Sequence, residues 1–234
     1  MSANSRHQRK KTPSKINMLD QVNCWIFDLD NTLYPITKDL LSEIDAQMSR
    51  FVSNFLDIDP HESQKVQKKY FREYGLTLRG LMIHHKLDPD VFFKETAPKN
   101  LEKIQPNPAL GEIINTLPGR KLIYTNSARE HAELVLERLG IRSVFEGVFD
   151  IKAANYVPKP AEKPYRKMCE QFFIEPHTAL MVDDIARNLR PASALGMTTV
   201  WMQTTAEWAE TSDVEDFIDI TINDISTWLS NIQS

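Results

Sequence analysis

The residues best suited to chemistry follow an apolar run near the start of the chain. The run at 25–27 leads directly into Asp28 and Asp30, with Thr32 two residues further on. If a buried strand ends here in a loop, both carboxylates can face one point beyond the carboxyl edge of a sheet, where open α/β sheets bind ligands. Such a pair can hold a hard cation such as Mg²⁺, or divide the roles of nucleophile and general acid/base. The alternative is an Asp-x-Asp turn that caps the next helix.

Apolar runs that read as buried strands recur in the second half of the chain. They lie at 121–124, 148–151, 179–182 and 198–202. Continuous apolar strands that alternate with helical patterns are typical of a parallel sheet covered on both faces. We therefore predict a doubly wound α/β core. One of its helices is expected to start at Ser127, which can form a capping box with Glu130, and to stop at Gly140.

Residues between the first strand and the second have a different pattern, which is helical throughout. Apolar residues recur at three- and four-residue steps from Leu40 to Phe55, and Pro89 is expected to open a short fourth helix. The predicted division is a disordered basic tail at 1–17, an α/β core at 18–34 and 105–234, and an all-helical cap at 35–104 inserted after the first strand.

Composition limits the class of protein. The chain has 234 residues, of which 41% are hydrophobic and 26% charged, as is typical of a soluble globular protein. No apolar run approaches the roughly 20 residues that a membrane span needs, so no membrane partner is expected. Cys24 and Cys169 fall in an apparent strand and an apparent helix, which favours free thiols in a reducing cytosol and a cytoplasmic location.

Charge is unevenly distributed although the net charge is only −4. Residues 1–17 carry five bases and no acid, whereas 207–224 carry seven acids and no base. The basic tail lacks the apolar segment of a signal peptide, so we interpret it as a solvated extension outside the fold. Contact with nucleic acid or organelle targeting is the alternative, and no nucleic-acid partner is expected.

Two later strands also end in polar groups. Thr125 and Asn126 follow the strand at 121–124, at the start of a helix, where free amides can bind an anion. Asp183 and Asp184 follow the strand at 179–182, which adds carboxylates at the same edge. A hard cation surrounded by acids needs an anionic partner, and phosphate is the natural candidate.

Lys159 lies between two prolines just before a helix. A lysine fixed there could neutralise a carboxylate nucleophile and the charge that develops on a transferred phosphoryl group. A solvated surface lysine is the alternative. Lys163 is the local rival, and we favour Lys159 because the flanking prolines restrict its backbone.

In this order, these residues resemble the signature segments of the haloacid dehalogenase (HAD)-like hydrolase superfamily, over about residues 22–204. The matching segments are Asp28 to Thr32, Thr125, Lys159 and Asp183-Asp184. The resemblance implies a Mg²⁺-dependent phosphomonoesterase whose nucleophile, Asp28, forms an aspartyl-phosphate intermediate. Asp30 would protonate the leaving alcohol and then activate water.

The resemblance also implies ligand sets. Mg²⁺ would be held by the Asp28 side chain, the Asp30 backbone carbonyl and Asp184, while Thr125 and the Asn126 amide grip phosphate oxygens. Asp183 stands where relatives commonly have glycine, and we interpret it as a residue that binds the metal through a bridging water. Asn188 matches a position that is acidic in many relatives, and its amide could orient a ligand; a helix-surface position is the alternative.

Segments outside these motifs look like the pyrimidine 5′-nucleotidase subfamily. They are 74–82, 117–121, 184–189 and 194–201. This closer resemblance implies hydrolysis of a nucleoside 5′-monophosphate such as UMP or CMP. Arg79 would help to select the substrate, with a helix-surface salt bridge as the alternative. One departure bears on the substrate: relatives often carry a His-Asp-x-Asp-like run where 97–100 reads Ala-Pro-Lys-Asn.

Several functional alternatives remain open at this point. The helical cap would act as a lid over a small-molecule phosphomonoester, with Tyr34, Arg79 and His84 as candidate lid-side contacts. The same core could serve a sugar phosphate or phosphoglycolate. Carbon–halogen hydrolysis is less expected, because that branch works without metal, and a non-catalytic binding protein is less expected because every motif residue is present. The sequence does not indicate the oligomeric state.

Overall fold

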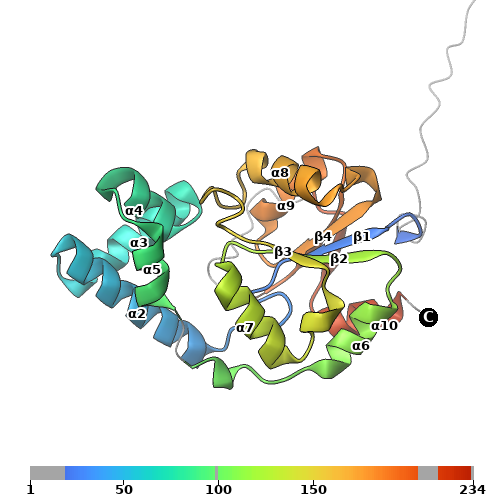
Figure 1. The fold of residues 1–234 in the computed structure, drawn as a ribbon, viewed down its shortest axis with the longest axis horizontal. Helices are drawn as coiled ribbons and strands as arrows, with labels where there is room; N and C mark the ends of the chain where they lie inside the picture. Colours follow the sequence, from blue (N-terminus) through green and yellow to red (C-terminus); the bar gives the residue numbers. More distant parts are fainter. Residues whose placement is uncertain (1–18, 98–99, 205–215, 233–234) are drawn as a thin grey trace, which may run out of the picture.

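The computed structural model describes residues 19–97, 100–204 and 216–232 (Figure 1). The predicted basic tail therefore lies outside the described residues, as do parts of the acidic stretch and of the segment 97–100. Within the described residues, no helix is both long and apolar enough to cross a membrane.

The core is a parallel sheet with the strand order β3-β2-β1-β4-β5-β6. The strands are β1 (Cys24–Phe27), β2 (Arg120–Tyr124), β3 (Gly147–Phe149), β4 (Ala179–Asp183), β5 (Thr198–Met202) and β6 (Ile220–Ile222). The order changes direction at β1, with β2 on one side and β4 on the other. This arrangement confirms the predicted doubly wound α/β fold.

Helices cover both faces of the sheet, as Figure 1 shows. The core helices are α6 (Pro108–Thr116), α7 (Arg129–Leu139), α8 (Glu162–Phe172), α9 (Ala186–Ala194) and α10 (Ile225–Asn231). Alternate residues of β1 explain this layering. Trp25 and Phe27 pack with α6, α7 and α10, whereas Cys24 and Ile26 pack with α8 and α9. Because side chains alternate along a strand and both faces are covered, β1 is apolar without interruption.

One predicted helix start is wrong. The helix α7 begins at Arg129, and its N-cap residue, Ala128, makes no side-chain cap hydrogen bond. Ser127 was expected to cap this helix, but its hydroxyl donates to the Asp30 carboxylate, 97 residues away in sequence. A tertiary contact with a buried acid has replaced the local capping box.

Between β1 and β2 the chain forms a separate helical layer. Its helices are α2 (Lys38–Leu56), α3 (Pro60–Tyr74), α4 (Thr77–His85) and α5 (Pro89–Thr96), followed by the short turn η1 (Leu101–Lys103). Local signals define these elements: Thr37 and Asp59 accept backbone N–H bonds as N-caps, and Pro89 occupies the first position of α5 as predicted. The layer has its own apolar cluster around Val52 and Leu81. The domain division at 35–104 stays a prediction.

The helical layer contacts the core along a defined seam. The guanidinium carbon of Arg187 in α9 lies 5.2 Å from the ring centre of Phe71 in α3. Gly75, the C-cap residue of α3, approaches the loop before α8 so closely that an added Cβ would lie 2.8 Å from the Lys159 carbonyl oxygen. Its φ of +79° is readily adopted only by glycine. Gly75 thus places the end of α3 directly against the loop that carries Lys159.

Candidate active site

Parallel pairing brings the ends of β1, β2 and β4 to one edge of the sheet. Phe27 is in register with both Ile123 and Val182, so the next residue of each strand reaches the same level. The backbone N–H of Asp28 donates to the Val182 carbonyl at 2.8 Å, which extends this register beyond β1. Thr125, after β2, is 1% exposed. The predicted polar strand ends therefore meet at the carboxyl edge.

Lys159 is the centre of this cluster, with its side chain 1% exposed. Its ammonium donates to Asp28 Oδ1 at 2.7 Å, to Asp183 Oδ2 at 2.6 Å and to the Tyr124 carbonyl at 3.0 Å. Asn126 fixes the loop, because its Oδ1 accepts the Lys159 backbone N–H at 2.8 Å. Burial disfavours the charged lysine, yet the carboxylates of Asp183 and Asp28 raise the pKa of Lys159 above its ordinary value.

Three buried carboxylates lie close enough together to hold a metal ion. Asp28, Asp183 and Asp184 each offer an oxygen within 4.8 Å of the others. Burial raises the pKa of Asp28 well above its usual range, and the ion pair with Lys159 opposes that rise. One ammonium among three carboxylates leaves surplus negative charge in a dry site, which a divalent cation would compensate. The residues thus fit a divalent metal ion.

The two neighbouring acids of the fourth motif have different surroundings. Asp183 accepts hydrogen bonds from Lys159 and from the Asn188 amide, the latter at 2.9 Å. Asn188 is therefore a buried partner of an acid and not a helix-surface residue. Asp184 Oδ2 accepts from the Asn31 amide at 2.8 Å. In the structure Asp183 binds Lys159 directly, although its carboxylate also belongs to the metal-capable group.

The Asp30 carboxylate is held by a set of hydrogen-bond donors. Its Oδ1 accepts from the Tyr34 hydroxyl at 2.6 Å and lies 3.0 Å from His131 Nε2. Its Oδ2 accepts from the Ser127 hydroxyl at 2.7 Å and, at 3.5 Å, from that of Thr125. The Asp30 side chain is not in the metal-capable carboxylate group, so only its predicted backbone-carbonyl contact with a metal remains a prediction.

The surroundings shift the pKa of Asp30 in the direction opposite to that of Asp28. Burial opposes ionisation of Asp30, but His131 and the hydrogen bonds from Tyr34 and Ser127 outweigh it and lower the pKa of Asp30. Burial likewise opposes the charged form of His131, while the Asp30 carboxylate raises the pKa of His131 above its usual value. The surroundings of Asp30 therefore stabilise its ionised form.

The three lid-side candidates differ in their surroundings. Tyr34 belongs to the loop after β1 and bonds Asp30, so it is not a lid residue. His84 is exposed and pairs with the Tyr74 hydroxyl at 2.6 Å. Arg79 lies half-buried in α4 and forms no hydrogen bond or ion pair through its side chain with the described residues. The alternative, a helix-surface salt bridge, is therefore absent there, and the predicted role in substrate selection stays a prediction.

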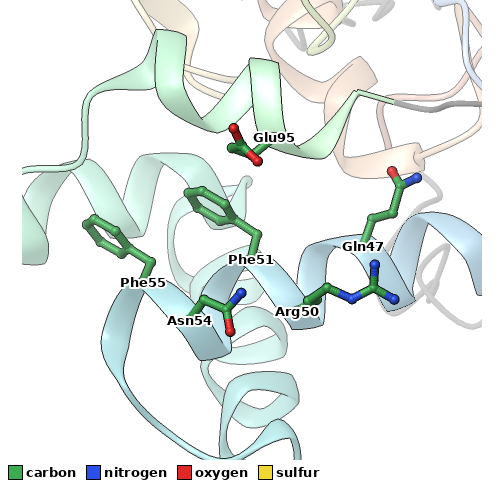
Figure 2. A pocket seen from close by; sticks show the side chains of 6 residues that line it. All are labelled: Gln47, Arg50, Phe51, Asn54, Phe55 and Glu95. Atoms are coloured by element: carbon green, nitrogen blue, oxygen red, sulfur yellow. The ribbon is translucent and has the colours of Figure 1, made fainter.

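A separate hollow lies on the outer part of the helical layer, between α2 and α5. Its volume is about 330 Å³, and Figure 2 shows the side chains that line it. They are Gln47, Arg50, Phe51, Asn54, Phe55 and Glu95. None of these residues belongs to the carboxylate cluster, so this hollow is not the centre of the site.

Sequence reasoning missed His131 and assigned the wrong role to Ser127. The two residues are four apart, with Ser127 just before α7 and His131 in its first turn, and both reach the same acid. That spacing was the available signal, but it gained meaning only once Asp30 was known to lie opposite. Asn31, whose φ of +63° is unusual for a residue other than glycine, was also missed as a partner of Asp184.

Comparisons with known proteins agree with this geometry. A profile described as haloacid dehalogenase-like hydrolase matches residues 22–196. Phosphate metabolism protein 8 of Saccharomyces cerevisiae is 27% identical over 190 residues, which cover 74% of this chain and 59% of that protein. The chain thus spans about three fifths of that relative's length.

Solved structures share the fold at low identity. A HAD phosphatase from Thermococcus onnurineus has a TM-score of 0.62 at 18% identity, covering 91% of this chain and 98% of that chain. A predicted phosphoglycolate phosphatase from Haemophilus somnus has a TM-score of 0.64 at 17% identity, covering 90% and 98%. Such identities show the fold alone.

Sheet order and edge chemistry together define a class of protein, a doubly wound α/β protein with an acid and lysine site at its topological switch point. Because the family profile matches most of the chain, the protein belongs to the haloacid dehalogenase-like hydrolases.

Proposed function

We propose that this hydrolase is a Mg²⁺-dependent phosphomonoesterase that acts on nucleoside 5′-monophosphates, with the pyrimidine nucleotides UMP and CMP preferred. The observation that carries the proposal is the buried network in which one ammonium, that of Lys159, bridges Asp28 and Asp183 at 2.7 and 2.6 Å. Such a network holds a carboxylate nucleophile in place and provides positive charge where a phosphoryl group would arrive.

Hydrogen bonds to both carboxylate oxygens fix the orientation of Asp28. Oδ1 accepts from Lys159 at 2.7 Å, and Oδ2 accepts from the Thr32 hydroxyl at 3.0 Å. In the proposed first step an Asp28 oxygen bonds to phosphorus, the bond from phosphorus to the leaving oxygen breaks, and Asp30 gives that oxygen a proton. In the second step Asp30 takes a proton from water, the water oxygen bonds to phosphorus, and phosphate leaves Asp28.

Asp30 needs a proton before it can act as an acid. The free site stabilises its ionised form, as described above. A phosphate dianion arriving beside Asp30 would raise its pKa through like-charge repulsion, so that a proton is taken up with the substrate. The same donors then favour the ionised form when Asp30 must serve as the base.

The side chains of Asp28 and Asp184, together with the backbone carbonyl of Asp30, would hold Mg²⁺. When bound, this ion would neutralise charge on the phosphate oxygens. Asn31 donates to Asp184 Oδ2 and so fixes one proposed ligand in place. Thr125 and the Asn126 amide are the proposed contacts to phosphate oxygens.

The nucleotide preference rests on the resemblance of 74–82, 117–121, 184–189 and 194–201 to pyrimidine 5′-nucleotidases. Two features support a substrate role for the first of these segments. Gly75 lies against the Lys159 loop, and Arg79 is a half-buried cation without an ion pair among the described residues. The relative from yeast is named for phosphate metabolism, which is compatible with a phosphatase.

Phosphate release from UMP, CMP, AMP and several sugar phosphates, with Mg²⁺ or with EDTA, tests the proposal. We expect Mg²⁺-dependent turnover that is fastest with UMP and CMP. The Asp28→Asn variant should lose turnover, whereas Asp39→Asn, an equivalent change on the exposed first turn of α2, should keep it. Equal rates with sugar phosphates would refute the nucleotide preference, and an active Asp28→Asn enzyme would refute the nucleophile.

A further inference from the structure

One partly buried side chain beside Asp30 has no step in the proposed mechanism. The imidazole of His131 is 17% exposed, and its Nε2 lies 3.0 Å from Asp30 Oδ1. Its Nδ1 is buried and has no hydrogen-bond partner among the residues that the structure describes. Asp30 is therefore the hydrogen-bond partner that the structure gives this ring. We propose that His131 is a positioning residue which, with Tyr34, anchors one oxygen of Asp30 and thereby aims the other at the leaving group; this inference rests on the proposed phosphatase function.

The donors around Asp30 are divided unequally between its two oxygens. Oδ1 has two close partners, Tyr34 Oη at 2.6 Å and His131 Nε2 at 3.0 Å. Because a carboxylate oxygen has two lone pairs in its plane, these two partners saturate Oδ1. Oδ2 has one close partner, the Ser127 hydroxyl at 2.7 Å, and a longer contact of 3.5 Å to the Thr125 hydroxyl. Oδ2 is thus the oxygen with capacity left to carry a proton.

The surroundings of Oδ2 agree with this division. Besides the Ser127 hydroxyl at 2.7 Å, Oδ2 faces the hydroxyl of Thr125 at 3.5 Å. Thr125 follows β2 at the edge where Asp28 follows β1, and it is a proposed phosphate contact. Oδ1 is directed toward the loop after β1 and the start of α7. A carboxylate held at Oδ1 can rotate little about its Cβ–Cγ bond, so Oδ2 stays directed at the reacting group. General acid catalysis depends on that alignment.

The helix that carries His131 is itself rigidly placed. On its inner face Ala132, Val135 and Leu136 are 0% exposed and pack against the sheet. The backbone position of His131 is therefore fixed by this packed face. Since the Asp30 carboxylate can only accept here, the ring carries hydrogen on Nε2 and donates to Asp30 Oδ1; this proton position follows from the hydrogen-bond network.

Two substitutions distinguish the effect of the hydrogen-bond donor of His131 from the effect of its side-chain volume. His131→Leu removes the Nε2 donor and keeps an apolar side chain, whereas His131→Gln restores an N–H donor at a similar reach. The value of kcat/KM for an alkyl phosphate, whose leaving oxygen needs a proton, is compared with that for p-nitrophenyl phosphate, whose leaving group departs without one. This ratio reports on Asp30 as an acid, because kcat/KM covers steps up to departure of the leaving group.

We expect His131→Leu to lower kcat/KM for the alkyl phosphate by about tenfold or more, part of the roughly 10²–10⁴ that general acid catalysis supplies. The value for p-nitrophenyl phosphate should change by less than about threefold, and His131→Gln should recover most of the loss. Tyr34→Phe, which removes the other anchor, should give the same selective loss.

Equal losses of kcat/KM with both substrates would overturn the inference, because they indicate a general structural defect. No loss with either substrate would also overturn it, because the contact between His131 and Asp30 would then contribute nothing to catalysis. Melting temperatures of the variants show whether the fold is retained. Failure of the proposed function is a separate result, because the unaltered enzyme would then release phosphate from neither compound.

Discussion

The contact between Gly75 and the Lys159 loop allows a sharp test of how the helical layer meets the core. Gly75 and Gly140 are both C-cap residues in the left-handed region, with φ values of +79° and +75°. Their surroundings differ. A Cβ added to Gly75 would lie 2.8 Å from the Lys159 carbonyl oxygen and 3.2 Å from Pro158 Cγ, whereas one added to Gly140 would meet only Pro108 Cβ, at 3.9 Å.

Gly140→Ala is therefore a matched control for Gly75→Ala. Both variants bear the left-handed strain of about 1–2 kcal/mol, which lowers the melting temperature by roughly 2–4 °C per kcal/mol in a chain of this size. Only Gly75→Ala must also widen a contact from 2.8 Å to the 3.4 Å at which ordinary van der Waals contact begins. Either the Lys159 loop or the end of α3 has to move by several tenths of an ångström.

That movement should reduce activity. A displacement of about 1 Å at a reacting group can lower a rate about 10²-fold, so roughly half that shift predicts a loss of about tenfold in kcat/KM for Gly75→Ala. Gly140→Ala should keep kcat/KM within about twofold, since its strain lies away from the acid cluster. Steady-state phosphate release and thermal melting measure both effects. If the two variants have the same melting temperature and the same kcat/KM, the packing of α3 on the Lys159 loop is not as described.

Three further outcomes are expected. Lys159→Met should lower the free energy of unfolding by about 3–5 kcal/mol at neutral pH, because it leaves buried carboxylates unpaired. Lys159 also opposes the rise in the pKa of Asp28 that burial causes. Without Lys159 the variant should regain stability as pH falls and Asp28 is protonated. Urea denaturation from pH 8 to 5 measures this, and a loss of stability that is the same at every pH would contradict it. Mg²⁺ should raise the melting temperature of the unaltered protein by mass action, and EDTA should reverse the rise; no response at millimolar Mg²⁺ would argue against a metal site. Burial raises the pKa of Cys24 and of Cys169 to about 11, from 9.0. The thiols of the native protein should therefore react slowly with iodoacetamide at pH 8, and those of the unfolded protein quickly. The free energy of unfolding should fall as pH rises from 9 to 11, because only the thiols of the unfolded chain ionise there.

Local patterns were sufficient for most of the secondary structure. The first strand and the cap helices carry clear signals, such as the N-cap Asp59 and Pro89 at the start of α5, because capping and periodicity act over a few neighbouring residues. The strand β6 and the helix α10 were missed. The strand has three residues in an acid-rich stretch, which is too short for a period to stand out, and it is stabilised by pairing with β5.

The sequence by itself determined the residue types of the site and the edge on which they gather. Parallel strands must bring their carboxyl ends together, so Asp28, Thr125 and Asp183 could be placed at one edge from order alone. Only the tertiary structure decided the partners. Ser127 bonds Asp30 instead of capping its helix, and His131 reaches the same acid across about a hundred residues of chain. The physical reason is that a buried carboxylate must be paired by whichever donors the packed helices bring within hydrogen-bond reach, and local sequence carries no record of that distance.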